Sequence, residues 1–141
     1  MNCWEFSIDV GGTFTDCIAR NPFGELKTCK FLSSGIIKGK VQKILNNFLI
    51  NFLDINGNII QKNKIKNYHS ETGFFELNLP YEIIPDTSYE LFSGEEAPLL
   101  CIRYLMNLRL DQEIGQIKVR LGTTKGTNAL LERKGEKIEA G

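Results

Sequence analysis

The sequence predicts a mixed fold of the α+β or α/β class, in which a β-meander comes first and helices follow. Apolar and polar residues alternate from Trp4 to Val10, which is typical of a strand with one buried face. Two further strand-like runs follow after short turns, whereas a clear helical pattern begins only near Ser93. The 141 residues, 42% of them hydrophobic, are sufficient for one domain with a modest core.

The first strand leads into a paired-glycine turn. Gly11 and Gly12 can adopt backbone conformations that other residues avoid, so the amides of the turn are free to converge on an anion. Thr13 and Thr15 add hydroxyl donors. This combination predicts a phosphate-binding loop. An ordinary Gly-Gly hairpin turn between two strands is the alternative.

Two carboxylates flank this turn. Asp9 is expected to project from the end of the strand, on the face opposite Val10, and Asp16 follows the turn. A carboxylate beside bound phosphates is repelled unless a divalent cation lies between them. We therefore expect Asp9, and also Asp16, to hold Mg²⁺ directly or through water. Solvated aspartates are the alternative.

The next strands are expected at Thr15–Arg20 and Leu26–Leu32, joined by the turn Asn21-Pro22-Phe23-Gly24. Together with the first strand they make a three-stranded meander. A β-rich insertion is expected to follow at about residues 36–92.

Within that insertion the apolar residues between Val41 and Phe52 fit a helical stripe as well as strands. Their β-branched and aromatic content, with a turn at Asn56-Gly57-Asn58, favours strands. A further strand is expected at Gly73–Leu79, which Pro80 ends.

A helix is predicted over Ser93–Leu108. Pro98 is tolerated only near the first turn, and the acidic pair Glu95 and Glu96 favours the N-terminal end. This pair could act in acid/base chemistry, although complementing the helix dipole is the simpler role. The expected apolar side of this helix consists of Leu99, Ile102, Leu105 and Met106.

A last strand is predicted at Ile117–Leu121, turning at Gly122 into a helix that Gly135 ends. Thr123 or Thr124 would cap this helix, and its free amides suit a phosphate or a substrate carboxylate. The candidate substrate-side residues are Thr123, Thr124, Thr127 and Asn128. Simple capping of the helix is the alternative explanation for them.

Two blocks of sequence resemble a known family. The run Asp9-x-Gly11-Gly12-Thr13-x-Thr15-Asp16 resembles the first phosphate motif of the actin-like ATPase and sugar-kinase superfamily, where a hairpin wraps the β- and γ-phosphates of ATP. The block Arg120–Gly135, with Ser33-Ser34-Gly35 and Leu91–Pro98, resembles the N-terminal region of hydantoinase A and 5-oxoprolinase proteins. The resemblance implies a ribonuclease-H-like N-terminal lobe spanning residues 1–141.

This resemblance also implies an activity, the ATP-dependent hydrolysis of a cyclic amide. The substrate would be 5-oxoproline, giving glutamate, ADP and phosphate, or a hydantoin analogue, with ATP and Mg²⁺ as cofactors. In the family an apolar strand follows Gly135, whereas here the polar run Glu136–Gly141 follows, so a partial chain is expected. A downstream domain or a second subunit would complete the active site, and no catalytic residue is assigned.

Two other functions fit the sequence. The chain could be a catalytically silent fragment or an interaction module, or it could be a sugar-kinase-like phosphotransferase. The second shares the first phosphate motif but not the block that begins at Arg120.

Composition argues against several other classes. Lys and Arg number 17, as do Asp and Glu, so no global charge attracts nucleic acid or an anionic membrane. The four cysteines form no CxxC pair and His69 is the single histidine, so no zinc site is expected. We expect reduced thiols in a cytoplasmic protein. The apolar stretch Ile44–Ile60 is broken by polar residues, which argues against a membrane span.

Overall fold

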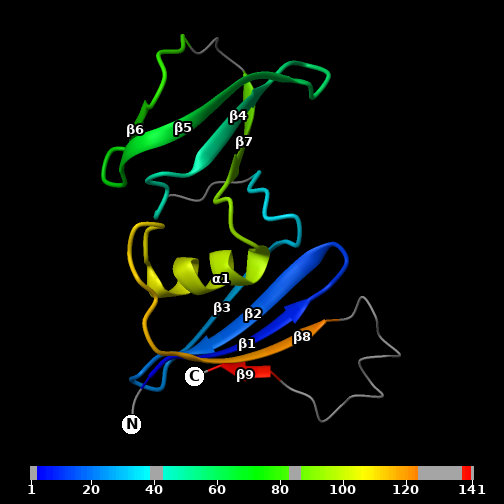
Figure 1. The fold of residues 1–141 in the computed structure, drawn as a ribbon, viewed down its shortest axis with the longest axis vertical. Helices are drawn as coiled ribbons and strands as arrows, with labels where there is room; N and C mark the ends of the chain where they lie inside the picture. The colour runs from blue at the N-terminus through cyan, green and yellow to red at the C-terminus, as the bar shows by residue number, and fades with distance from the viewer. Residues whose placement is uncertain (1–2, 39–42, 83–86, 124–137, 141) are drawn as a thin grey trace.

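The computed structural model describes residues 3–38, 43–82, 87–123 and 138–140, and these form a mixed α+β fold made mostly of strands (Figure 1). The first sheet has the order β3-β2-β1-β8-β9 and the second has the order β6-β5-β4-β7. Helix α1 (Ala97–Met106) lies between the two sheets. The strands of the first sheet are β1 (Glu5–Val10), β2 (Phe14–Arg20), β3 (Leu26–Leu32), β8 (Lys118–Thr123) and β9 (Ile138–Ala140). Those of the second sheet are β4 (Leu49–Leu53), β5 (Ile59–His69), β6 (Phe74–Leu77) and β7 (Ser88–Phe92).

The predicted meander is confirmed. Strand β2 pairs antiparallel with both β1 and β3, and β8 returns parallel to β1 on its other side. The turn between β2 and β3 is closed by the Asn21 side chain, whose Oδ1 accepts the amides of Phe23 and Glu25, each at 2.9 Å. Such side-chain bonding to the backbone is the reason asparagine favours turns.

One face of the first sheet is buried and the other is open. The alternation along β1 and β2 places Phe6, Ile8, Cys17 and Ala19 in the interior, while Asp9 and the other residues of opposite phase are exposed. Helix α1 covers the buried face with Cys101, Ile102 and Leu105.

The second sheet confirms that the segment after residue 48 forms strands. Asp54 closes the turn between β4 and β5, because its Oδ1 accepts the amides of Asn56 at 2.9 Å and Asn58 at 2.8 Å. Gly57 has φ +84°, a left-handed conformation that glycine adopts without strain. The core of this sheet consists mainly of Phe48, Ile50, Phe52, Ile65 and Leu91, with Leu100 from α1. The predicted strand after Gly73 is also present, as β6.

Helix α1 begins at Ala97, later than the prediction of Ser93. Ser93 Oγ accepts the amide of Glu95 at 3.1 Å and Gly94 has φ +87°, so this segment forms a turn rather than helix. Glu96 occupies the N-cap and Pro98 lies in the first turn. Leu99 was expected on the apolar side but is 37% exposed, because the helix buries Leu100 against the second sheet instead.

Strand β8 continues through Gly122 to Thr123, so the predicted turn at Gly122 is wrong. Pairing with β1 explains the extension, since Gly122 and Thr123 lie opposite Asp9 and Val10. The predicted helix, with Thr124, Thr127 and Asn128, lies outside the described residues. Among the helices that the structure describes, none is long and apolar enough to cross a membrane.

Candidate functional site

The β1–β2 turn lies at one end of the strands of the first sheet (Figure 1). The segment after β3 is tied to it, because the Ser33 amide donates to the Thr13 carbonyl at 2.8 Å and Ser33 Oγ donates to the Gly11 carbonyl at 2.7 Å. The same segment also passes close to the chain that leads into α1, since a Cβ added at Gly35 would lie 3.5 Å from the Glu95 carbonyl oxygen. We refer to Asp9–Asp16 and Ser33 together as the hairpin site.

The two carboxylates of the hairpin site face each other across β1 and β2. Asp9 and Asp16 are direct cross-strand partners, and both lie exposed on the open face of the sheet. Such partners have Cβ atoms about 5 Å apart, so two like charges here oppose strand pairing. Lys30 on β3 is 3.6 Å from Asp16 and offsets this only in part, since both side chains are more than half exposed. A cation between the carboxylates would relieve the repulsion.

The tip of the turn offers free donors. Thr13 and Gly12 are exposed, and their amides make no hydrogen bond within the described part of the chain. Neither Gly11 nor Gly12 has a positive φ, so the special backbone expected of the paired glycines is absent. A Cβ added at Gly12 would meet nothing within 4 Å. The protein's own packing therefore does not require glycine at position 12, and the missing side chain leaves space above the free amides.

Thr15 lies on the other side of the strand from the carboxylates. Its side chain is fully buried, and its hydroxyl is hydrogen bonded to Ser33 Oγ at 2.9 Å. The expectation that this hydroxyl donates to a phosphate does not fit its position. Thr15 instead supports Ser33, which holds the Gly11 carbonyl. The alternation of the strand predicts this burial, because Thr15 lies on the same face as the apolar residues Cys17 and Ala19.

The register of the first sheet places the first residues of the second block, Arg120–Thr123, beside β1. Strand β8 places the Thr123 backbone beside Val10 and that of Gly122 beside Asp9. The carboxyl ends of β1 and β8 thus lie at one edge, and ligands of sheets with parallel strands commonly bind beyond such ends. Of the predicted substrate-side residues, Thr123 reaches this edge, while Thr124, Thr127 and Asn128 lie outside the described ranges.

A magnesium ion fits this donor set. In residues 3–38, 43–82, 87–123 and 138–140, no three or more His, Cys, Asp or Glu side chains are arranged to hold a metal ion. Mg²⁺ commonly takes one or two protein carboxylates and completes its shell with phosphate oxygens and water. The pair Asp9 and Asp16 has the number and kind of ligands for that mode.

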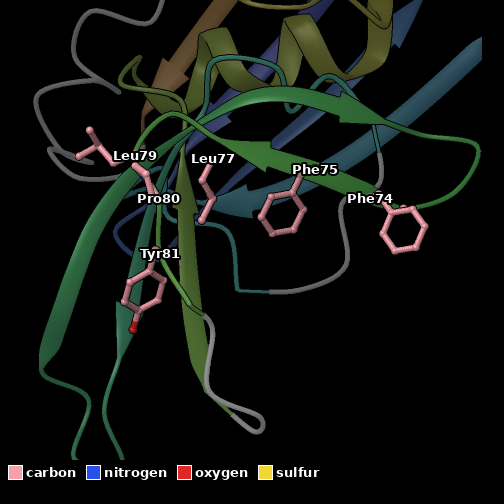
Figure 2. Close-up of a pocket in the computed structure, with 7 residues that line it drawn as sticks. Phe74, Phe75, Leu77, Leu79, Pro80 and Tyr81 are labelled. Atoms are coloured by element: carbon pink, nitrogen blue, oxygen red, sulfur yellow. The ribbon is translucent and has the colours of Figure 1, made fainter.

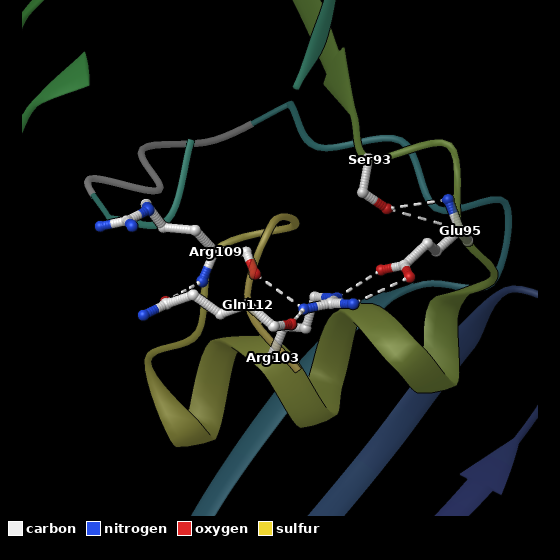
Figure 3. A network of polar contacts seen from close by, with 5 residues as sticks. All are labelled: Ser93, Glu95, Arg103, Arg109 and Gln112. Carbon is white, nitrogen blue, oxygen red and sulfur yellow. Dashed lines mark hydrogen bonds and ion pairs between the residues drawn. The ribbon is translucent and has the colours of Figure 1, made fainter. Parts of the chain in front are cut away.

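Glu95, considered above for acid/base chemistry, is bound by the buried Arg103 (Figure 3). Nε of Arg103 donates to Oε1 of Glu95 at 2.7 Å, and Nη2 donates to Oε2 at 3.3 Å. Nη1 donates to the carbonyl oxygens of Arg109 at 2.7 Å and Gln112 at 2.8 Å. The pair links the segments before and after α1. Glu95 is therefore a structural residue, and it lies before the first turn of the helix that it was expected to complement.

A pocket of about 420 Å³ lies in the second sheet, beside β6 and the segment that follows it (Figure 2). Its lining residues are Gly73, Phe74, Phe75, Leu77, Leu79, Pro80 and Tyr81. None of these described residues carries a charged side chain that could bind phosphate or a metal ion.

No family model matches the chain, and neither a curated protein nor a solved structure matches it. The inference of function therefore rests on the hairpin site and on the sequence resemblance of the first phosphate motif. Those two sources agree on one feature, a turn with free amides beside a pair of carboxylates.

Proposed function

We propose that this chain is the phosphate-binding N-terminal part of an ATP-dependent cyclic-amide hydrolase of the hydantoinase A and 5-oxoprolinase type. The observation that carries the proposal is the opposed pair Asp9 and Asp16 beside the free amides of Gly12 and Thr13. The order of elements supports a ribonuclease-H-like lobe, since the meander is followed by α1 and then by β8, parallel to β1.

In this proposal the turn binds the β- and γ-phosphates of ATP. The amides of Gly12 and Thr13 and the exposed Thr13 hydroxyl donate to phosphate oxygens. The absence of a side chain at Gly12 allows the phosphates to approach the main chain. Thr15 and Ser33 hold the shape of the turn from inside.

Asp9 and Asp16 would hold Mg²⁺, and the bound ion would offset the negative charge of the phosphates. A divalent cation between the two aspartates would replace their cross-strand repulsion by attraction of each carboxylate to the ion. Lys30 restrains Asp16 at the outer side of the pair.

The chemistry that this arrangement serves is the activation of an unreactive amide. Transfer of the γ-phosphoryl group to the carbonyl oxygen of a cyclic amide makes a better leaving group for attack by water. Positioning and charge stabilisation are the main contributions that a protein makes to phosphoryl transfer, and the hairpin site supplies both for the phosphate side. The cyclic amide lies toward the end of β8 with Thr123, and a downstream domain or second subunit of the enzyme supplies the adenosine site.

Calorimetric titration of the full chain with Mg·ATP tests the nucleotide site. We expect binding that requires Mg²⁺ and is lost in Asp9→Asn. Gly12→Ala should weaken binding without lowering the melting temperature of the free protein, because the added methyl group meets only open space. Asp111→Asn is the matched control, since this exposed carboxylate pairs with Arg109 and lies outside the hairpin site. Equal binding by wild type and Asp9→Asn would reject the site, and no binding by wild type would favour the silent interaction module.

The substrate class needs a second experiment. The chain, joined to the remainder of a homologous enzyme, should release phosphate and glutamate in equal amounts from ATP and 5-oxoproline, and Asp9→Asn should abolish both. A stably phosphorylated acceptor in place of free phosphate would instead identify a sugar-kinase-like phosphotransferase.

A further inference from the structure

Three cysteine thiols meet between the first sheet and α1. Cys17 on β2 and Cys29 on β3 are direct cross-strand partners, and Cys101 projects from α1. All three belong to one apolar cluster, in which Cys29 packs against the buried Cys17 and Cys101. Cys17 and Cys101 are buried, whereas Cys29 is partly exposed.

Cys29 is the member of this cluster that a solute can reach. It lines a pocket of about 550 Å³ along β3, which is an edge strand of the first sheet. Lys30, Phe31 and Tyr104 are among its other lining residues. Neither Cys17 nor Cys101 lines this pocket. A small reagent in solvent therefore meets Cys29 first.

The surroundings of Cys29 favour its thiolate. Hydrogen bonds from Cys101 and then Cys17 lower the pKa of Cys29, and they outweigh burial, which raises it. The Lys43 ammonium group lowers it further, and the Asp16 carboxylate opposes this. The pKa of Cys101 is raised by its interactions with Cys17 and then Cys29, and by burial. The cluster thus combines one accessible thiol of lowered pKa with two buried thiols whose pKa values are raised.

We propose that Cys29 is a peroxide-reactive thiol that forms a disulfide with Cys17. The Cys29 thiolate attacks one oxygen of hydrogen peroxide, the O–O bond breaks, and the departing hydroxide takes up a proton to become water. Cys29 is then a sulfenic acid. The Cys17 sulfur attacks the Cys29 sulfur, the S–O bond breaks, and the oxygen leaves as a second water after receiving the Cys17 proton. Both thiols are oxidised and one peroxide is reduced to two waters.

The register identifies Cys17, rather than Cys101, as the disulfide partner of Cys29. Directly opposed residues on antiparallel strands have Cβ atoms about 5 Å apart, and a disulfide needs about 4 Å. The required approach is therefore about an ångström, and the edge position of β3 leaves that strand free to move on one side. Cys101 instead contributes to the lowered pKa of Cys29, as the first of its causes.

Competitive alkylation of the reduced wild-type chain tests the reactivity of Cys29. Cys3 is the internal control, because it is also partly exposed and lies outside the cluster of three cysteines. With iodoacetamide at mildly acid pH we expect Cys29 to react about tenfold faster than Cys3, since an ordinary thiol is only a few per cent ionised near neutral pH. Equal rates with the same pH profile would overturn the proposal, and this measurement needs no variant that could fail to fold.

Treatment with hydrogen peroxide, followed by peptide mass mapping, tests the disulfide. We expect a Cys17–Cys29 linkage in wild type, and in Cys17→Ala a Cys29 sulfenic acid that dimedone traps. Cys3→Ser is the matched control and should form the linkage at the wild-type rate. A linkage through Cys101, or oxidation confined to Cys3, would overturn the assignment.

Discussion

Replacement of Arg103 by Met should destabilise the protein by about 3 kcal/mol. The change keeps an apolar stem of similar length but removes the guanidinium group, which bonds the Glu95 carboxylate and two carbonyl oxygens. Removing one partner of a buried ion pair commonly costs about 3–5 kcal/mol. The lower figure applies because the Glu95 side chain is 27% exposed, so water can solvate the remaining carboxylate. A domain is stable by only about 5–15 kcal/mol, so this loss is a large fraction of the total.

Urea unfolding followed by tryptophan fluorescence measures this loss. Trp4 is the single tryptophan, and its ring stacks on Phe6 with centroids 5.6 Å apart, so its emission reports on the first sheet. The melting temperature should fall by about 10 °C. Arg109→Met is the matched control, because that side chain is 46% exposed and pairs with an exposed Asp111. The control should lose less than about 0.5 kcal/mol.

The network in Figure 3 also predicts how a second substitution behaves. Glu95→Gln added to Arg103→Met should recover part of the lost stability, because it removes the unpaired charge. Equal losses in Arg103→Met and Arg109→Met would refute the reasoning. So would a double variant whose loss is the sum of the two single losses.

Two further predictions concern side chains that bond beside turns. Thr15→Val should lower the free energy of unfolding by about 1 kcal/mol, because the hydrogen bond between the buried hydroxyl and Ser33 is lost. Thr28→Val on the exposed face is the control and should change this free energy little. Urea titration measures both. Asp54→Ala should be destabilising at neutral pH but not in strong acid. Amides, first that of Asn58, hold the pKa of Asp54 below its ordinary value of 3.8, so its contribution is present above that value and is lost as pH falls through the lowered pKa. A difference in urea midpoint that persists in strong acid would contradict this origin.

Much of the first sheet could be predicted because its signal is local. Period-two alternation located β1, and the Asn21 turn divided β2 from β3. The same alternation assigns Thr15 to the interior, yet the motif in which it lies favoured a ligand role. Motif and strand phase disagreed there, and the phase decided the position of the side chain.

The errors in α1 have a non-local cause. The helix is covered on two sides, by Cys101 and Ile102 against the first sheet and by Leu100 against the second. A helix buried on two sides lacks the single apolar stripe from which a face is predicted. The partners of Arg103 could not be predicted from local sequence either, because its bonds to Glu95 and Gln112 depend on turns at both ends of the helix.

The parallel pairing of β1 with β8 has a consequence for the order of folding. Glu5 lies opposite Lys118, so the chain must close a very long loop before these strands meet. For a loop on the order of 100 residues the entropic cost is about 4 kcal/mol, whereas the β1–β2 hairpin closes almost at once. During synthesis the meander therefore assembles first, with the far side of β1 still an open edge. Prior folding of the second sheet shortens the remaining loop, and β8 then completes the sheet at the strand that carries Asp9.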